Sequence, residues 1–247
     1  MKICVLNSGG LDSSVCTAYA VDKYGRENVV TASLFYGQRH QKELECAEAI
    51  AKHYRLAHYE RDISSVFADA GNVCSLMQGS DIEMAKKSYA EQIAESGKPN
   101  TEVPMRNGLF LLCAASMVMS LFPDEEVTII YGAHADDAAG NAYPDCSPEF
   151  AELADKLIQV GSRDKVHLER PLINMNKAGV VKLGLELNVP FAKTWSCYEG
   201  GAKACGRCGT CIDRIAAFKA NGVIDPIDYG IEIDWSGCKT IKYLQEV

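Results

Sequence analysis

Residues 2–16 read KICVLNSGGLDSSVC, an apolar run that breaks into two glycines before an aspartate and two serines. The run predicts a buried strand, and the pattern after it predicts a helix over about residues 11–24. A strand, a glycine turn and a helix N-terminus together form an anion site, because free backbone N–H groups and the positive end of the helix face one point. This stretch therefore predicts a loop that binds phosphate.

Asp12 places a carboxylate beside the predicted phosphate site, and this arrangement requires a cation. The glycines let the backbone approach a ligand and the serine hydroxyls can donate to phosphate oxygens, but a carboxylate repels phosphate unless a cation lies between them. The sequence therefore predicts Mg²⁺ beside Asp12. The loop has neither the Gly-Lys-Ser/Thr ending of a Walker A motif nor the G-x-G-x-x-G of a dinucleotide site.

Strand-like and helix-like stretches alternate along the chain, which is typical of an α/β protein with a parallel sheet covered on both faces. The expected strands are 2–7, 29–35, 57–63, 126–134 and 165–172. The expected helices are 11–24, 41–54, 107–122, 147–160, 177–188 and 211–222. The helix over 107–122 is apolar nearly all round, so we expect it to be buried. Residues 64–101 are polar and less regular.

The chain has eleven cysteines, of which Cys197, Cys205, Cys208 and Cys211 are separated by seven, two and two residues. Four thiolates on a glycine-rich loop suit a closed structural Zn²⁺ site. Free thiols and an iron–sulfur cluster remain alternatives, since thiolates alone do not fix the metal. We expect an α/β domain over residues 1–190 and a zinc-binding segment over 191–247, packed on the same domain.

Several polar side chains follow predicted strands, at the sheet edge where α/β proteins bind ligands. Arg39 and His40 come after the second strand, and Lys177 begins a later helix. Arg106 also begins a helix, where a cation is unfavourable for the helix dipole, so we expect it to have an anionic partner.

The overall composition narrows the function. A net charge of −8 disfavours a broad, sequence-independent grip on nucleic acid. No apolar run is long enough to suggest a membrane span, and the N-terminus lacks a signal-peptide pattern, so we expect a cytoplasmic protein.

Together these motifs resemble the QueC family of 7-cyano-7-deazaguanine synthases, within the ATP-pyrophosphatase (PP-loop) superfamily. The matching pieces occur in the family's order from residue 7 to 211: NSGGLDSSVC, YGQRHQKE, VPMRN, YPDCSPEF, PLINMNK, TWSCYEGG and CGRCGTC. The resemblance implies a Rossmann-like, adenine nucleotide alpha hydrolase-like sheet, and a homodimer.

The resemblance also implies a ligase that forms C–N bonds. ATP would adenylate the carboxylate of 7-carboxy-7-deazaguanine with release of pyrophosphate, and ammonia would displace AMP to give an amide. A second ATP would activate the amide oxygen, so that elimination leaves the nitrile. The implied cofactors are ATP, Mg²⁺ and Zn²⁺, with the four clustered cysteines as the zinc ligands.

Residue roles follow from the resemblance and from the chemistry of the side chains. The expected ATP-binding residues are Asn7, Ser8, Gly9, Gly10, Leu11, Asp12, Ser13 and Ser14. The expected catalytic residues are Asp12, Arg106 and Lys177. Arg39, His40 or Arg106 could hold the substrate carboxylate or the α-phosphate. Asp145 could accept hydrogen bonds from the N1–H and 2-amino groups of the deazaguanine, with Tyr143 stacked on the ring.

One segment departs from the family pattern. Residues 132–150, GAHADDAAGNAYPDCSPEF, differ from the shorter approach to YPDC in many members, and they would bring His134, Asp136 and Asp137 to the base pocket. An enzyme that stops at the amide, or that passes the activated deazaguanine to a protein amine, therefore stays open.

Two further alternatives are less favoured. A tRNA-modifying PP-loop enzyme would usually carry an RNA-binding domain or a catalytic cysteine pair, and a basic footprint is missing here. A non-enzymatic binding module leaves Asp12 beside a phosphate site unexplained. The sequence shows no glutamine-hydrolysing domain, so we expect free ammonia or another amine as the nitrogen donor.

Overall fold

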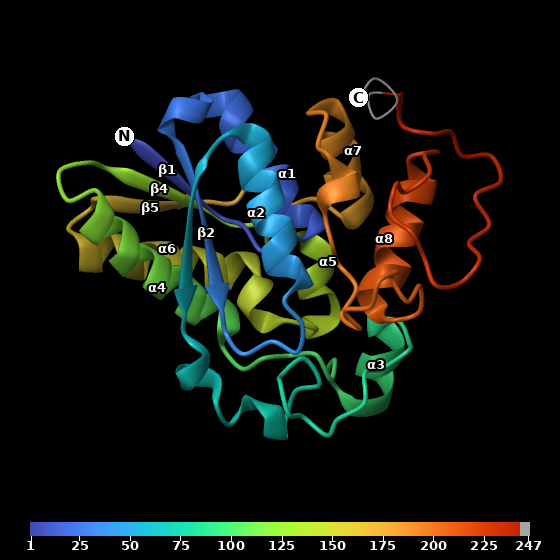
Figure 1. Ribbon diagram of the computed structural model, residues 1–247. Helices are drawn as coiled ribbons and strands as arrows, with labels where there is room; N and C mark the ends of the chain where they lie inside the picture. The colour runs from blue at the N-terminus through green and yellow to red at the C-terminus, as the bar shows by residue number, and fades with distance from the viewer. Residues whose placement is uncertain (243–247) are drawn as a thin grey trace.

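Five strands form one parallel sheet in the computed structural model, which describes residues 1–242 (Figure 1). The sheet order is β3-β2-β1-β4-β5. The strands are β1 (Lys2–Leu6), β2 (Val29–Phe35), β3 (Ala57–Asp62), β4 (Val127–Ile130) and β5 (Val166–Glu169). Strand β1 pairs with both β2 and β4, so the order reverses beside it. A crevice is expected at the carboxyl ends of β1 and β4, because the connections from these strands leave toward opposite faces.

Helices cover both faces of the sheet, as the sequence predicts. They are α1 (Leu11–Tyr24), α2 (Lys42–Tyr54), α3 (Tyr89–Ser96), α4 (Arg106–Leu121), α5 (Ala135–Ala138), α6 (Pro148–Ser162), α7 (Lys177–Glu186) and α8 (Gly209–Ala220). Side chains of α4 and α6 pack with Cys4, Val30 and Ile129 in one apolar cluster. Those of α1, α7 and α8 pack with Ile3 and Val5 in another. Neighbouring β1 residues thus face opposite layers, as strand geometry requires.

Helix α4 corrects one expectation. Its sequence is apolar nearly all round, but only Leu111, Ala114, Ala115 and Val118 are buried, and Leu112 is 44% exposed. The physical reason is position: α4 packs on the sheet with one face and beside α6, and nothing in the described chain covers its outer face. The apolar outer face is therefore a surface feature.

Residues 64–101 lie below the sheet in Figure 1 and contain only short helices, of which α3 is the longest. Ser88 accepts a hydrogen bond from the Glu91 backbone N–H, and the Glu91 carboxylate accepts one from the Ser88 backbone N–H. This capping box fixes where α3 begins. As a result, Tyr89 has a defined place in the wall of the cavity described below.

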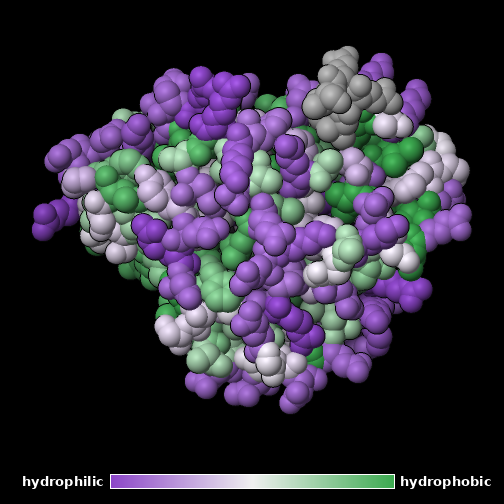
Figure 2. All heavy atoms as spheres, in the orientation of Figure 1, coloured by the Kyte–Doolittle hydropathy of each residue, from purple (hydrophilic) through white to green (hydrophobic). Residues whose placement is uncertain are grey.

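The C-terminal segment packs on the α/β core. Ala217 and Phe218 of α8 belong to the same apolar cluster as Ile3 and Val5. Figure 2 shows hydrophobic patches over α8 and the chain after it, where Ile212, Ile215 and Ile233 line a shallow groove. The last five residues of the segment predicted over 191–247 lie outside the described residues.

Among residues 1–242, no helix is both long enough and apolar enough to span a membrane.

Candidate active site

The loop between β1 and α1 is fixed by a hydrogen bond to α2, by one within the loop and by one glycine. The Asn7 side chain donates to the Ala47 carbonyl at 3.0 Å and accepts from the Gly9 N–H at 3.0 Å. Gly9 has φ +77°, and a Cβ there would lie 2.0 Å from the Glu43 carbonyl oxygen. Only glycine fits, because a side chain would meet backbone in a conformation that L-residues rarely adopt.

The N-terminus of α1 is open toward the loop. Gly10 is the N-cap and supplies no side-chain cap, and the Ser14 N–H donates to the Gly10 carbonyl at 3.1 Å. The hydroxyl oxygens of Ser8 and Ser13 lie 3.1 Å apart. Uncapped N–H groups and two hydroxyls at a helix N-terminus suit an anion such as a phosphate.

Lys177 forms the centre of a charged network beside this loop. Its Nζ lies 2.6 Å from Asp12 Oδ2 and 3.1 Å from His134 Nε2, and that nitrogen is 3.3 Å from Asp137 Oδ2. Burial raises the pKa of Asp12, but Lys177 and His134 outweigh it and hold this pKa below its ordinary value. Burial likewise opposes the charge on Lys177, but Asp12 and Asp137 outweigh it and raise the lysine pKa. The network therefore keeps a cation and a carboxylate together beside the loop.

Two more carboxylates face Lys177. Burial raises the pKa of both Asp137 and Asp213. Asp136 has a different place, because its Oδ2 accepts the Lys177 backbone N–H at 2.7 Å. Of the three residues that the sequence brings to the base pocket, Asp137 lines the cavity, and His134 is buried behind Lys177.

Arg106 also differs from expectation. Its guanidinium lies 5.5 Å from the centre of the Tyr36 ring and 5.9 Å from that of Phe110, and Nη1 is 3.4 Å from the Tyr36 hydroxyl. Within residues 1–242 no carboxylate lies within ion-pair distance of it, so the expected anionic partner is not found in that part of the chain. Aromatic faces hold the cation by cation–π attraction instead, and its charge is left for a ligand.

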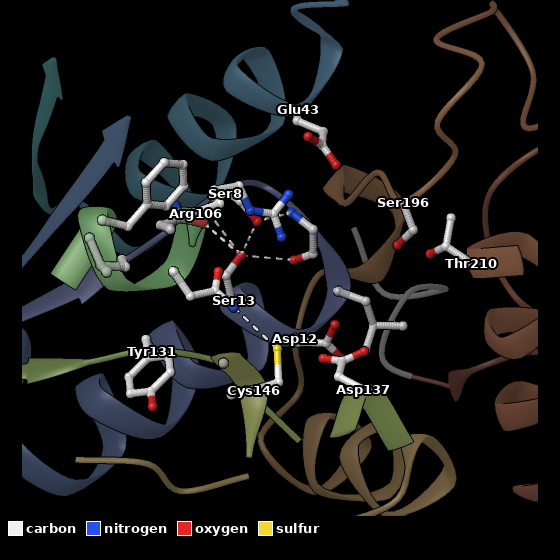
Figure 3. A pocket seen from close by; sticks show the side chains of 18 of the residues that line it. Ser8, Asp12, Ser13, Glu43, Arg106, Tyr131, Asp137, Cys146, Ser196 and Thr210 are labelled. Atoms are coloured by element: carbon white, nitrogen blue, oxygen red, sulfur yellow. Dashed lines mark hydrogen bonds between the residues drawn. The ribbon is translucent and has the colours of Figure 1, made fainter. Parts of the chain in front are cut away.

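A single cavity contains most of these groups, at the carboxyl ends of β1, β2 and β4 (Figure 3). From the expected ATP-binding set it is lined by Asn7, Ser8, Gly10, Leu11, Asp12 and Ser13. Gly9 and Ser14 are buried and do not line the cavity. Arg106, Tyr143 and Lys177 also line the cavity.

Three other expected substrate-binding residues do not line this cavity. Arg39 is exposed, and its Nη2 donates to the Ser80 carbonyl at 2.7 Å. The ring of His40 would contact a Cβ at Gly200, which places it beside the cysteine cluster. Asp145 Oδ2 accepts the Asn107 backbone N–H at 2.9 Å and so stabilises the start of α4.

The cavity also contains residues that the sequence did not single out, chiefly Glu43, Tyr89, Tyr198 and Asp213. Glu43 and Tyr198 stand inside the motifs YGQRHQKE and TWSCYEGG, and Asp213 lies two residues after CGRCGTC. Their positions in or next to these motifs could have identified them as candidate site residues. Tyr89 gave none, because it lies in the irregular segment 64–101.

The four clustered cysteines converge as their spacing predicts. The Sγ atoms of Cys197, Cys205, Cys208 and Cys211 all lie within 4.8 Å of one another, and those of Cys205 and Cys211 are 3.9 Å apart. Four sulfurs at about 2.3 Å from a tetrahedral Zn²⁺ would be roughly 3.8 Å apart. The donor set therefore fits a closed metal site.

Backbone N–H groups support these sulfurs. The Cys205 N–H donates to Cys197 Sγ at 3.2 Å, and the Cys208 N–H donates to Cys205 Sγ at 3.3 Å. Such donors stabilise thiolates and orient metal ligands. Because Trp195, Ser196 and Tyr198 line the cavity on either side of Cys197, the cluster also positions that wall.

Comparison with known proteins gives one consistent result. Residues 2–222 match the model of the family described as queuosine biosynthesis protein QueC. A 7-cyano-7-deazaguanine synthase from Caldicellulosiruptor saccharolyticus is 42% identical, over 95% of this chain and 98% of that protein. Another from Archaeoglobus fulgidus is 39% identical, over 92% of this chain and 90% of that protein.

Among solved structures, an NH₃-dependent NAD synthetase from Campylobacter jejuni aligns with a TM-score of 0.42 and 14% identity, over 76% of this chain and 65% of that one. A likeness at this level carries no functional argument.

Proposed function

Because the chain belongs to the QueC family, we propose that it is an ATP-dependent ligase that converts 7-carboxy-7-deazaguanine to 7-cyano-7-deazaguanine with ammonia. ATP would be cleaved to AMP and pyrophosphate. The observation that carries the proposal is that one cavity contains an anion-binding loop, two cations and a group of aromatic rings. A nucleotide and a planar carboxylate-bearing heterocycle need such a combination.

The chain's own residues would act mainly by position and charge. Ser8, Ser13 and the N-terminus of α1 would hold the phosphates. Lys177 and Arg106 would stabilise the negative charge that develops as the α-phosphate is attacked by the substrate oxygen. Asp12 would hold Lys177 in place until the nucleotide binds, since the two side chains form an ion pair here.

Two metals belong to the proposal. Asp12 and Asp137 lie beside the loop and suit Mg²⁺, which binds through one or two carboxylates together with phosphates. When bound, Mg²⁺ would neutralise phosphate charge. The four clustered cysteines would hold a structural Zn²⁺, because four protein ligands leave no position open for substrate. Use of ATP and of reduced thiols would suit the cytoplasm.

We also propose a homodimer, and the outer faces of α4 and α6 support it. Leu153, Leu157 and Val160 on α6 are 66%, 58% and 68% exposed, and they recur at helical spacing. Leu112 and Met119 of α4 are exposed as well. An apolar surface of this kind commonly marks an interface. Light scattering should give the mass of two chains, and Leu157→Glu should give that of one; a monomeric wild type would contradict the dimer.

The test of the function is a reaction that contains purified protein, Mg-ATP, 7-carboxy-7-deazaguanine and ammonium, analysed by mass spectrometry. The proposal expects the nitrile together with AMP and pyrophosphate. Accumulation of an adenylate or amide without nitrile would instead favour transfer to another acceptor, and the next step would be a search for a modified protein. Absence of any ATP- and deazaguanine-dependent product would refute the proposal.

A further inference from the structure

One part of the cavity is bounded by aromatic rings. Tyr36, Phe110, Tyr143 and Tyr198 line it, and α3 contributes Tyr89, whose hydroxyl lies 3.4 Å from that of Tyr198. Tyr89 and Tyr143 meet edge to face with ring centres 5.7 Å apart. Such rings offer flat apolar faces to a planar heterocycle. We call this part the aromatic subpocket.

Glu43 supplies a carboxylate to this subpocket. It stands in the first turn of α2, is half-buried and lines the cavity. Figure 3 shows it well apart from Asp12 and Asp137, on the same side as Arg106. Among the described residues no hydrogen bond or ion pair engages its carboxylate. Burial raises the pKa of Glu43 to about 7, and Arg106 opposes this rise. Burial removes water from this carboxylate, and no described residue replaces the lost hydrogen bonds. The site therefore suits a ligand that donates hydrogen bonds to Glu43.

The other carboxylates near the cavity face different groups. Asp12 pairs with Lys177, and Asp137 lies 3.3 Å from His134. Asp213 is without a hydrogen bond among the described residues, but it belongs to the Lys177 side: burial raises its pKa, and the charge of Lys177 opposes this rise. Asp145 accepts from the start of α4. Asp137 is also within electrostatic reach of Tyr89 and Tyr143, but it has His134 beside it. Glu43, which is within electrostatic reach of Tyr36 and Tyr198, is therefore the carboxylate at the aromatic subpocket that has no hydrogen-bond or ion-pair partner among the described residues.

We propose that Glu43 binds the substrate by accepting the two hydrogen-bond donors on the guanine-like edge of the heterocycle, N1–H and the 2-amino group. These donors are parallel and adjacent, so one carboxylate can accept both through its two oxygens. The inference rests on the proposed function and assigns to Glu43 the role that the sequence gave to Asp145. A ring stacked among the tyrosines would present this edge to α2.

The consequence is selectivity for a 2-amino heterocycle. A site built around a charged acceptor rejects an analogue without the donor, because the acceptor is then left desolvated and unpaired. Loss of one hydrogen bond to a charged group corresponds to about 10- to 100-fold in affinity. The effect should fall on the heterocycle alone, since in the proposed function ATP would bind at the loop between β1 and α1.

The test compares 7-carboxy-7-deazaguanine with its analogue that lacks the 2-amino group, using the zinc-loaded, full-length protein. Calorimetry and steady-state kinetics should both show that the wild type prefers the amino compound by about 10- to 100-fold. Glu43→Gln should lose most of this preference, with the KM for ATP and ammonium unchanged. Glu45→Gln, at an exposed position of the same helix, is the matched control and should behave like the wild type.

Several outcomes would overturn the inference. If the wild type binds both compounds equally, the inference is overturned. This comparison needs no variant, so it holds even if Glu43→Gln fails to fold. The inference is also overturned if the Glu43→Gln protein still prefers the 2-amino compound, or if the substitution changes the KM for ammonium instead. If the wild type neither binds nor converts 7-carboxy-7-deazaguanine, the proposed function fails as well; if only the selectivity is missing, the proposed function stands.

Discussion

Asp225→Asn should destabilise the protein strongly, because Asp225 neutralises a buried arginine. The guanidinium of Arg214 donates from Nε to Asp225 Oδ2 at 2.6 Å and from Nη2 to Oδ1 at 3.0 Å. The two side chains are only 1% and 0% exposed. Arg214 also donates from Nη1 to Thr194 Oγ1 at 2.9 Å and to Ser196 Oγ at 3.2 Å. The pair thus connects α8 to the wall of the cavity.

The magnitude follows from burial. Removing one partner of a buried ion pair leaves an uncompensated charge and costs about 3–5 kcal/mol. For a chain of this length, about 1 kcal/mol shifts Tm by roughly 2–4 °C, so we expect a decrease of roughly 6–20 °C. Asn and Asp have nearly the same shape, so packing changes little. The loss of unfolding free energy therefore measures the effect of removing the negative charge.

Urea and thermal unfolding of the zinc-loaded protein, followed by circular dichroism, would measure this. Glu95→Gln is the control, because it breaks the exposed Lys87–Glu95 pair, whose N···O distance is 2.7 Å, and should cost about 0–1 kcal/mol. The double variant Arg214→Met with Asp225→Leu should recover much of the loss, since it buries no charge. An Asp225→Asn protein as stable as Glu95→Gln would refute the reasoning.

Three further changes test the site, the metal and the pH dependence. Lys177→Met should lower kcat by about 10²–10³-fold, because a cation aimed at the phosphates is lost, and it should also lower Tm, because Asp12 loses its ion-pair partner; near-normal kcat would contradict its role. Cys211→Ser should reduce the zinc content measured by mass spectrometry and lower Tm, as should chelation of the wild type; an unchanged Tm after zinc loss would show that the metal is not structural. Burial opposes the charge on Glu169, but hydrogen bonds from Lys23, Tyr19 and Tyr24 outweigh it and hold the Glu169 pKa below its ordinary 4.5. A lowered folded-state pKa means that this stabilisation is present above pH 4.5 and is lost as the pH falls through the folded value. Glu169→Gln should therefore flatten the acid limb of the free energy of unfolding against pH, and an unaltered limb would argue against it.

The amino-acid sequence by itself determined the features that depend on neighbouring residues. The alternation of strands and helices, the glycine loop after β1 and the spacing of the four cysteines are local patterns, and the structure confirms all three. Helix α4 was the exception. Its composition predicts burial, but composition does not say how many neighbours surround a helix, and its outer face is exposed.

Tertiary structure decided which side chains meet. Glu43 stands far from Tyr198 and Asp213 in the chain, yet all three line one cavity. The Asp145 carboxylate is held by the start of α4. Lys177 meets Asp12 across 165 positions. Sequence patterns report which face of an element is apolar, but the direction of a polar side chain depends on how the layers pack. For that reason the sequence identified the chemistry of the site, and only the fold placed its carboxylates.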